Sequence, residues 1–313
     1  MADVLTGNCV WWRSQPGGDS TMTYSIPGDV AKVDLDGDGR IDRLYVGDMN
    51  ARIWRFDIGD LNKNGNSDPS EWVGKIIFHS NTGATEKRKI FYPPDVTLEK
   101  QDGVEYEMLF FGTGNREDPK DDSASRVDRL YAFKDKNKGS TATWTDLGEG
   151  ALVDVTADLL QDPSTSQTDK NTILGNLKAL NGWFIKAEKH VGEKCLASPL
   201  VYAKTAYYTT FAPTVGSETD PCFVGEGTAT LYAVKYDTGE AVLNLDLTND
   251  SGGTAVYRKS DRALKIGTAI PSGVVITVIG GKVVAYAGVG GGVERVQLTS
   301  TRSLFPLNWK LVF

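Results

Sequence analysis

Short runs of aromatic and small apolar residues alternate with polar or glycine-containing turns along most of this chain. Four segments share one pattern, in which a strand-like run is followed by a turn and then by a second strand-like run. Runs that are rich in β-branched and aromatic residues and bounded by turn signals are typical of β-strands. We therefore predict four pairs of neighbouring strands, at residues 44–48 and 53–57, 109–113 and 130–133, 207–210 and 231–234, and 285–288 and 293–296.

The repetition predicts an all-β fold, a modified β-propeller with about four countable blades. Glycine and alanine would lie near the crowded axis, and the aromatic residues would pack between blades. The second strands of successive pairs, marked by Trp54, Tyr131, Tyr232 and Glu294, are 77, 101 and 62 residues apart. A plain blade needs only about 40 to 50 residues, so the blades carry insertions. We expect residues 1–25 to be a lead-in segment and residues 26–313 to form the propeller domain.

Two insertions and the final segment have patterns of their own. Residues 116–126 are polar and predict a mobile, exposed loop. From Asp169 to Leu180 the apolar positions recur at helical spacing, which predicts a short helix packed on the outside and capped by Asp169 or Thr172. Residues 304–313 are largely apolar and predict a last strand, which should be paired inside a blade because a bare apolar edge favours aggregation.

Residues 34–42 have the oxygen spacing of a calcium-binding loop. Calcium takes six to eight oxygen ligands at about 2.3 to 2.6 Å, and a D-x-D-x-D-G spacing folds alternate side chains onto one point. An arginine head has no acceptor, so position 7 would contribute its backbone carbonyl. Glycine at position 6, Gly39, permits the sharp turn. The candidate ligands are the carboxylates of Asp34, Asp36, Asp38 and Asp42 and the carbonyl of Arg40.

The loop departs from the EF-hand pattern, because position 12 is Tyr45 and the bidentate glutamate is missing. Asp42 must then close the site, and the flanking residues 29–33 and 42–46 predict strands instead of helices. The alternative is a polar Asp-Gly turn without an ion, but four crowded carboxylates would repel one another in such a turn. A weaker copy at residues 60–68 has only two full charges, and it is either a second site or an Asn-Gly turn.

Composition narrows the functional classes. The net charge of −7 and the pI near 5 disfavour a nucleic-acid or anionic-membrane surface and favour proteins, ions or sugars as partners. With only His79 and His190, in unrelated surroundings, we expect no histidine-built zinc, copper or haem site. No run of 18 apolar residues predicts a membrane span, and residues 1–4 lack the pattern of an export signal, which would then have been removed or lie on a longer precursor.

The chain has three cysteines, Cys9, Cys195 and Cys222. Cys195 precedes a predicted strand and Cys222 lies in a turn-rich segment, so one excursion of the chain could bring them together. We expect a Cys195–Cys222 disulfide, worth about 3 to 4 kcal/mol in the chain-entropy model, with two unpaired thiols as the alternative. Cys9 would then be free or paired with a segment outside this chain.

The calcium loop and the strands after it resemble the carboxy-terminal domain of PilY-type proteins, the tip-associated adhesins of bacterial type IV pili. The similarity extends over residues 24 to about 310. The segments that carry it, besides the loop, are residues 45–57, 182–185, 198–201, 209–211, 220–222, 231–234 and 238–239.

This resemblance implies a modified β-propeller that reaches the cell surface through the periplasm and acts at the pilus tip with minor pilins or other tip proteins. It also implies that Ca²⁺ held by Asp34, Asp36, Asp38, Arg40 and Asp42 helps to balance pilus extension and retraction, and so supports pilus assembly, twitching motility and surface attachment. This sequence departs from the family pattern in two ways. Only 33 residues precede the calcium loop, so we expect either a fragment or a propeller completed by a second chain. The amino-terminal adhesive module of the family is also missing from this sequence.

Two other functional classes compete with this interpretation. A calcium-dependent carbohydrate-binding propeller would show exposed aromatic residues beside the ion. A quinone-dependent dehydrogenase also uses an aromatic-rich propeller with calcium, but the adjacent cysteines of that family are missing, and neither histidine has a nucleophile motif such as G-x-S-x-G. We therefore expect a protein that is not an enzyme.

Overall fold

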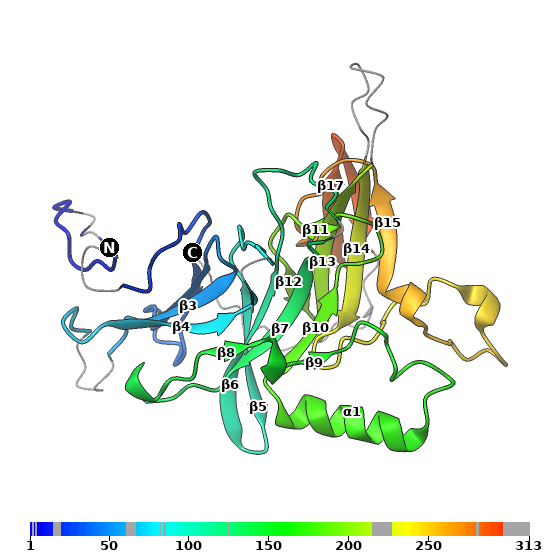
Figure 1. Ribbon diagram of the computed structural model, residues 1–313, viewed down its shortest axis with the longest axis horizontal. Helices are drawn as coiled ribbons and strands as arrows, with labels where there is room; N and C mark the ends of the chain where they lie inside the picture. Colours follow the sequence, from blue (N-terminus) through cyan, green and yellow to red (C-terminus); the bar gives the residue numbers. More distant parts are fainter. Residues whose placement is uncertain are drawn as a thin grey trace.

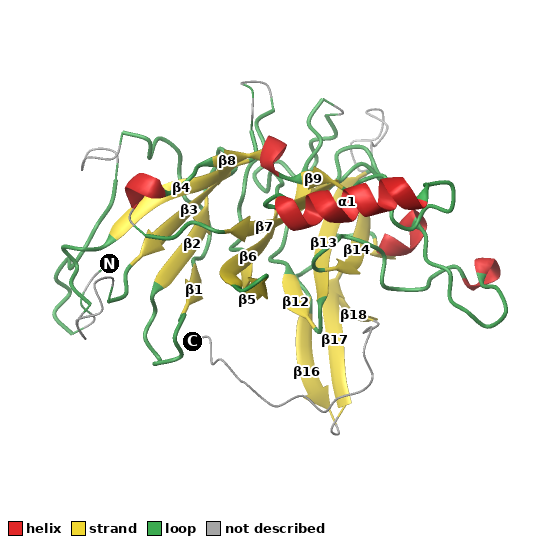
Figure 2. Ribbon diagram, turned by 90° about the horizontal axis from the view of Figure 1, so that it is seen from below, coloured by secondary structure: helices red, strands yellow, loops and turns green. Residues whose placement is uncertain are grey.

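Four mainly antiparallel β-sheets make up most of the fold. The first three succeed one another across the molecule in chain order, and the fourth lies beside the third (Figures 1 and 2). The structure is a computed structural model. It describes residues 1, 3, 5–14, 20–60, 67–81, 83, 86–123, 125–139, 141–214, 227–279 and 282–296. Among these residues, no helix has the length and apolar character needed to span a membrane.

The first sheet contains strands in the order β1-β2-β3-β4-β8. The first four strands form an antiparallel meander, whereas β8 pairs with β4 in parallel. The last pairing is unusual because β8 comes later in the chain than the central strands of the second sheet. The strands are β1 (Ala31–Val33), β2 (Arg43–Gly47), β3 (Arg52–Asp57), β4 (Val73–His79) and β8 (Leu147–Gly148).

The second sheet has the order β5-β6-β7-β10-β9, again a four-stranded antiparallel meander with a short parallel strand, β9, on β10. A long insertion between β7 and β10 contains η2 (Thr141–Thr143), β8, η3 (Glu149–Ala151), β9 and the helix α1. The strands are β5 (Asp95–Gln101), β6 (Val104–Gly112), β7 (Arg129–Asp135), β9 (Val153–Asp154) and β10 (Gly182–Lys186).

The third sheet is built on a long hairpin of β13 (Thr205–Pro213) and β14 (Gly227–Lys235). It also contains β11 (Lys194–Cys195), β12 (Leu200–Tyr202) and β15 (Ala263–Gly267), and η4 (Leu247–Asn249) and η5 (Lys259–Arg262) precede β15. The fourth sheet is a meander of β16 (Val275–Ile279), β17 (Lys282–Val289) and β18 (Gly292–Val296).

All four predicted strand pairs are confirmed as antiparallel neighbours, namely β2 with β3, β6 with β7, β13 with β14, and β17 with β18. The all-β prediction is therefore confirmed, and the four sheets correspond to the four predicted blades. The predicted last strand at residues 304–313 lies outside the described residues, as do most of the 60–68 loop and Cys222.

The core lies between successive sheets, because each sheet has apolar side chains on the faces that meet its neighbours. Between the first and second sheets, Phe78 makes aromatic contacts with Phe111, Tyr131 and Phe133 at centroid distances of 5.6, 5.3 and 5.1 Å. Trp183 is fully buried between the second and third sheets. Further clusters join the third sheet to the fourth, and Trp11 of the lead-in segment to Phe56 on the first.

The helix α1 (Gln167–Ala179) confirms the predicted helix, although it begins earlier than predicted. Its cap is Ser166, whose hydroxyl oxygen accepts from the backbone N–H of Asp169, so the prediction of Asp169 or Thr172 as the cap was wrong. Serine with a carboxylate three residues later is a favourable cap, because its hydroxyl accepts from the free N–H of Asp169 and donates to the carboxylate of the same residue. Leu177 is buried, and the helix contacts β9 and β10 on the outside of the sheets (Figure 1).

The polar segment at residues 116–126, which the structure describes except at residue 124, is anchored to the third sheet. The ammonium group of Lys194, a residue with 1% exposure, donates to the carbonyls of Pro119 and Asp121 at 3.1 and 2.6 Å. Asp121 also pairs with Arg126. A Cβ at Gly192, where φ is +70°, would come within 2.8 Å of the Asp121 carbonyl oxygen. The close approach of the backbone at residue 192 to this segment therefore depends on glycine.

The predicted disulfide is not present at Cys195. Its thiol is free, 3% exposed and 3.4 Å from the carbonyl oxygen of Ala197, to which it donates. The side chain lies against Gly112 of the second sheet, and burial raises the pKa of the thiol to about 12. The thiol is thus enclosed between two sheets, and Cys222, its predicted partner, lies outside the described residues. Cys9 is free and exposed.

Candidate metal centre

The predicted calcium loop connects β1 to β2, as expected, and it begins and ends on a paired strand. Ala31 lies opposite Tyr45 and Val33 opposite Arg43, and the N–H of Asp42 donates to the carbonyl of Val33 at 2.9 Å. Between these ends the chain turns through Gly37 and Gly39, whose φ angles are +81° and +88°. These are left-handed conformations that glycine adopts without strain. The two antiparallel strands therefore bring both ends of the loop to one corner of the first sheet.

Three of the four predicted carboxylate ligands converge. One oxygen from each of Asp34, Asp36 and Asp42 lies within 4.8 Å of the others. Two ligands on opposite sides of a calcium ion are about 4.6 to 5.2 Å apart, twice the usual calcium–oxygen distance. The spacing of these three oxygens therefore fits a single bound calcium ion. An all-oxygen donor set also suits a hard cation and disfavours zinc or copper.

The other two predicted ligands lie nearer the tip of the loop. Asp38 is outside the three-carboxylate cluster, and one of its oxygens accepts from the N–H of Arg40 at 2.7 Å. The Arg40 guanidinium is exposed and 4.0 Å from Asp38, so it is only a weak counter-charge for the loop. The structure thus brings together Asp34, Asp36 and Asp42 and leaves Asp38 and Arg40 beside them.

Backbone N–H groups within the loop hold the carboxylates in place. The two oxygens of Asp34 accept from Gly37 and Gly39 at 2.6 and 3.0 Å, and Asp36 accepts from Asp38 at 3.1 Å. An oxygen of Asp42 accepts from Leu35 at 2.6 Å. Each carboxylate oxygen has two lone pairs, so these bonds orient the side chains without removing their capacity to bind a cation.

The electrostatics of the cluster favour a cation. Burial raises the pKa of Asp42, and the nearby charges of Asp36, Asp34 and Asp38 raise it further, whereas the hydrogen bond from Leu35 lowers it. The ionised form of Asp42 is therefore costly among these neighbouring negative charges. A bound divalent ion would turn this repulsion into attraction.

Gly59, just after β3, fixes the position of Asp42 and was not identified from the sequence. The carbonyl of Asp42 accepts from the N–H groups of Ile58 and Gly59 at 2.8 and 3.2 Å. A Cβ on Gly59 would lie 2.5 Å from Oδ1 of Asp42. The carboxylate thus occupies the space that any larger residue would fill. No spacing rule signals such a contact, because the two residues meet only when β2 and β3 pair.

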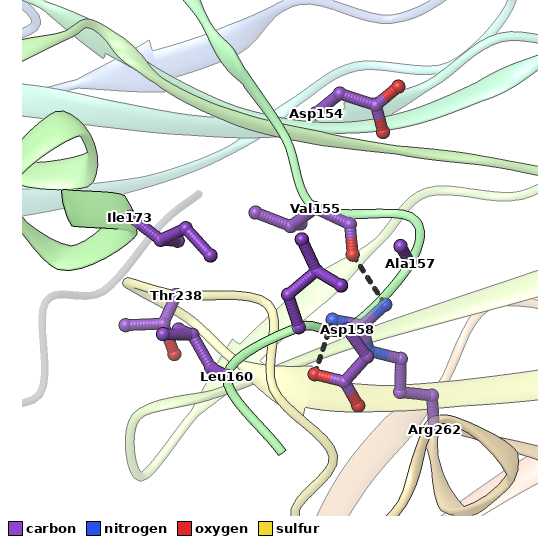
Figure 3. A pocket seen from close by; sticks show the side chains of 9 residues that line it. Asp154, Val155, Ala157, Asp158, Leu160, Ile173, Thr238 and Arg262 are labelled. Carbon is purple, nitrogen blue, oxygen red and sulfur yellow. Dashed lines mark hydrogen bonds and ion pairs between the residues drawn. The ribbon is translucent and has the colours of Figure 1, made fainter. Parts of the chain in front are cut away.

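A separate cavity of about 50 Å³ lies between α1, the segment after β9 and the third sheet. Figure 3 shows Ile173, Leu160 and Thr238 on one side and the pair of Asp158 and Arg262 on the other. Arg262 donates to the carbonyl of Val155 at 2.7 Å and to the Asp158 carboxylate at 3.0 Å. The space holds only a few water molecules, which is too small for a sugar or a quinone.

Burial makes this ion pair sensitive to pH. It raises the pKa of Asp158 from 3.8 to about 6, although the attraction of Arg262 lowers it. A carboxyl whose pKa is raised on folding contributes stability that is complete below pH 3.8 and is lost as the pH rises through 6. In buffer with a chelator, we expect the unfolding free energy of the wild type, relative to Asp158→Asn, to fall by about 1 kcal/mol between about pH 5 and pH 7. Urea unfolding at the two pH values measures this difference, and a rise would contradict the assignment.

Known proteins resemble this chain in sequence and in fold. No protein-family model matches it. A curated protein described as a type IV pilus biogenesis factor PilY1 homolog, from Xylella fastidiosa, is 24% identical over 241 residues, which cover 72% of this chain and 15% of that protein. The crystal structure of the Pseudomonas aeruginosa PilY1 C-terminal domain matches with a TM-score of 0.59 and 17% identity, over 95% of this chain and 65% of that one. This chain therefore has the fold of the PilY1 C-terminal domain.

The match to this solved domain confirms the resemblance to PilY-type proteins and agrees with the fold that the repeated strand pairs predicted. The chain spans about two thirds of the matching solved domain and a small part of the curated relative. An exo-1,5-α-L-arabinanase from a bovine ruminal metagenomic library also matches, but with a TM-score of only 0.30 and 9% identity. Such a weak likeness does not bear on the fold or the function of this chain.

Proposed function

We propose that this PilY-type domain is a non-enzymatic calcium-binding part of the type IV pilus machinery. It acts at the pilus tip with minor pilins or other tip proteins, and supports pilus assembly, the balance of extension and retraction, motility and surface attachment. The observation that carries the proposal is the convergence of Asp34, Asp36 and Asp42 in a strand–loop–strand corner of this fold. The similarity to a protein named as a type IV pilus biogenesis factor supports the pilus setting.

In this proposal, calcium stabilises the state in which the loop is closed. The gain is RT ln(1 + [Ca]/Kd), or about 2.7 kcal/mol when the free ion is a hundredfold above Kd. The residues of this chain contribute the ligands and the hydrogen bonds that orient them. A partner that contacts the corner would then meet different surfaces in the presence and absence of the ion.

Isothermal titration of the purified domain with CaCl₂ tests the metal part of the proposal, and MgCl₂ is the comparison. We expect one calcium per chain and weaker magnesium binding, because magnesium demands a tight octahedral geometry and releases its waters reluctantly. For the pilus part, the gene of the full protein would carry Asp36→Asn, and surface pili and twitching would be compared with the wild type. Wild-type pilus number and motility together with lost calcium binding would contradict a role for the ion there.

Gly59 provides a specific test of how Asp42 is positioned. Gly59→Ala should weaken calcium binding by about tenfold or more, because the added Cβ displaces the carboxylate, and loss of support around a ligand typically costs about 10- to 100-fold in affinity. Calcium titration measures the change. The matched control is Gly150→Ala, where a Cβ would meet nothing within 4 Å and which should bind like the wild type. Equal affinity for the two variants would show that Asp42 does not close the site.

A further inference from the structure

The strand residue that comes directly after Asp42 belongs to a charged network between the first two sheets. Arg43 is 3.0 Å from the carboxylate of Asp57 and 2.7 Å from that of Glu107. The side chains of Arg43, Asp57 and Glu107 are 16%, 7% and 9% exposed, so water screens these contacts poorly. Asp57 is on the first sheet and Glu107 is on β6 of the second. Arg43 therefore spans the boundary between the two sheets.

A second arginine extends the same network. Arg55 binds Asp57 through two nitrogens at 2.8 Å and reaches Asp135 of the second sheet at 2.9 Å. Asp135 lies directly opposite Glu107 in the pairing of β6 with β7. Two arginines of the first sheet thus meet two carboxylates of one strand pair in the second, which fixes the relative position of the sheets at this point.

The calcium loop is attached to this network on both sides. Asp42 is bonded in sequence to Arg43, and its carbonyl accepts from Ile58 and Gly59, which directly follow Asp57. A shift of Asp42 would therefore move either Arg43 or the end of β3. In a network of short, poorly screened contacts, neither can move freely, because a buried charge that loses its partner is strongly destabilising.

We propose that Arg43 is a positioning residue for the calcium site and that, through Glu107, it couples ion binding to the packing of the second sheet against the first. This inference rests on the proposed function, because it needs calcium to bind at the loop. Coupling between binding and packing is reciprocal. Breaking the contact with Glu107 weakens calcium binding, and calcium slows the opening of β6.

Two variants distinguish the geometry of the contact between Arg43 and Glu107 from its charge. Glu107→Gln removes the carboxylate that Arg43 reaches, and Arg43→Lys keeps the positive charge but cannot bridge two carboxylates with one planar fork. Coupled sites commonly affect each other by about 5- to 150-fold, and we expect each variant to weaken calcium binding by about fivefold or more. The control is Asp158→Asn, which also removes one carboxylate from a buried ion pair, between the segment after β9 and η5, but does not touch the loop.

Calcium titration of these proteins is combined with hydrogen exchange of β6 in the wild type, with and without CaCl₂. Weaker binding by Glu107→Gln and Arg43→Lys, normal binding by Asp158→Asn, and slower exchange of β6 with calcium support the coupling. Binding by both variants within about twofold of the wild type overturns it, as does an equal loss in the control. Should a variant fail to fold, the wild-type exchange decides, and no effect of calcium on β6 overturns the inference. A wild type that binds no calcium refutes the proposed function as well.

Discussion

Replacing Asp42 with alanine should remove calcium binding by this domain, with a loss of affinity of about 100-fold or more. Asp42 contributes one of three converging carboxylate oxygens and is the residue at which the loop rejoins the sheet. Its loss removes a charged ligand and also the acceptor for the N–H of Leu35. A change of about 100-fold corresponds to about 2.7 kcal/mol of binding free energy, which calorimetric titration with CaCl₂ resolves easily.

Because Asp42 is partly buried, its replacement could also disturb the fold, and Asp36→Asn is the cleaner companion. Asp36 is exposed and belongs to the same cluster, so its replacement should weaken binding with little effect on stability. Asp29→Asn is the matched control, since Asp29 is also exposed and lies five residues before the loop in sequence. Calcium binding by Asp36→Asn that equals that of Asp29→Asn would refute the ligand assignment.

Phe78→Ala should destabilise the domain by about 3 to 5 kcal/mol, the usual cost of deleting a large aromatic side chain from a core. Phe78 is fully buried where the first two sheets meet, with aromatic rings of the second sheet around it. The cavity would form among rigid strands, so little collapse can offset it. Urea unfolding followed by tryptophan fluorescence gives the free energy. Leu98→Ala on β5 is the control, and because Leu98 is 44% exposed its loss should cost much less. Similar losses for the two variants would contradict the position given to Phe78.

The central strand pairs of each sheet could be predicted because their signals are local. Each pair combines aromatic or β-branched runs with a turn, and these preferences act within about ten residues. The calcium loop could be predicted for the same reason, because its candidate ligands are neighbours in sequence and the pairing of β1 with β2 brings its ends together. The cap of α1 was missed because Ser166 and Asp169 act as a pair, and a single residue gave an incomplete signal.

Contacts between distant segments were not predictable in the same way. Nothing in the sequence around Gly59 shows that the side chain of Asp42 will occupy the space beside it, and nothing around Arg43 points to Glu107. Cys195 is a similar case. Its sequence context suggested a disulfide, whereas in the structure the surrounding residues bury a free thiol. These features depend on how strands pair within a sheet and on how one sheet packs on the next, which a single sequence does not encode in any short pattern.

The position of β8 has a consequence for how the chain folds during synthesis. This short strand comes after β7 in sequence yet completes the edge of the first sheet by pairing with β4. After β4 has left the ribosome, β5, β6 and β7 must also be synthesised before β8 can pair with β4. The first two sheets should therefore mature as one cooperative unit during translation, whereas the later sheets can be added one at a time.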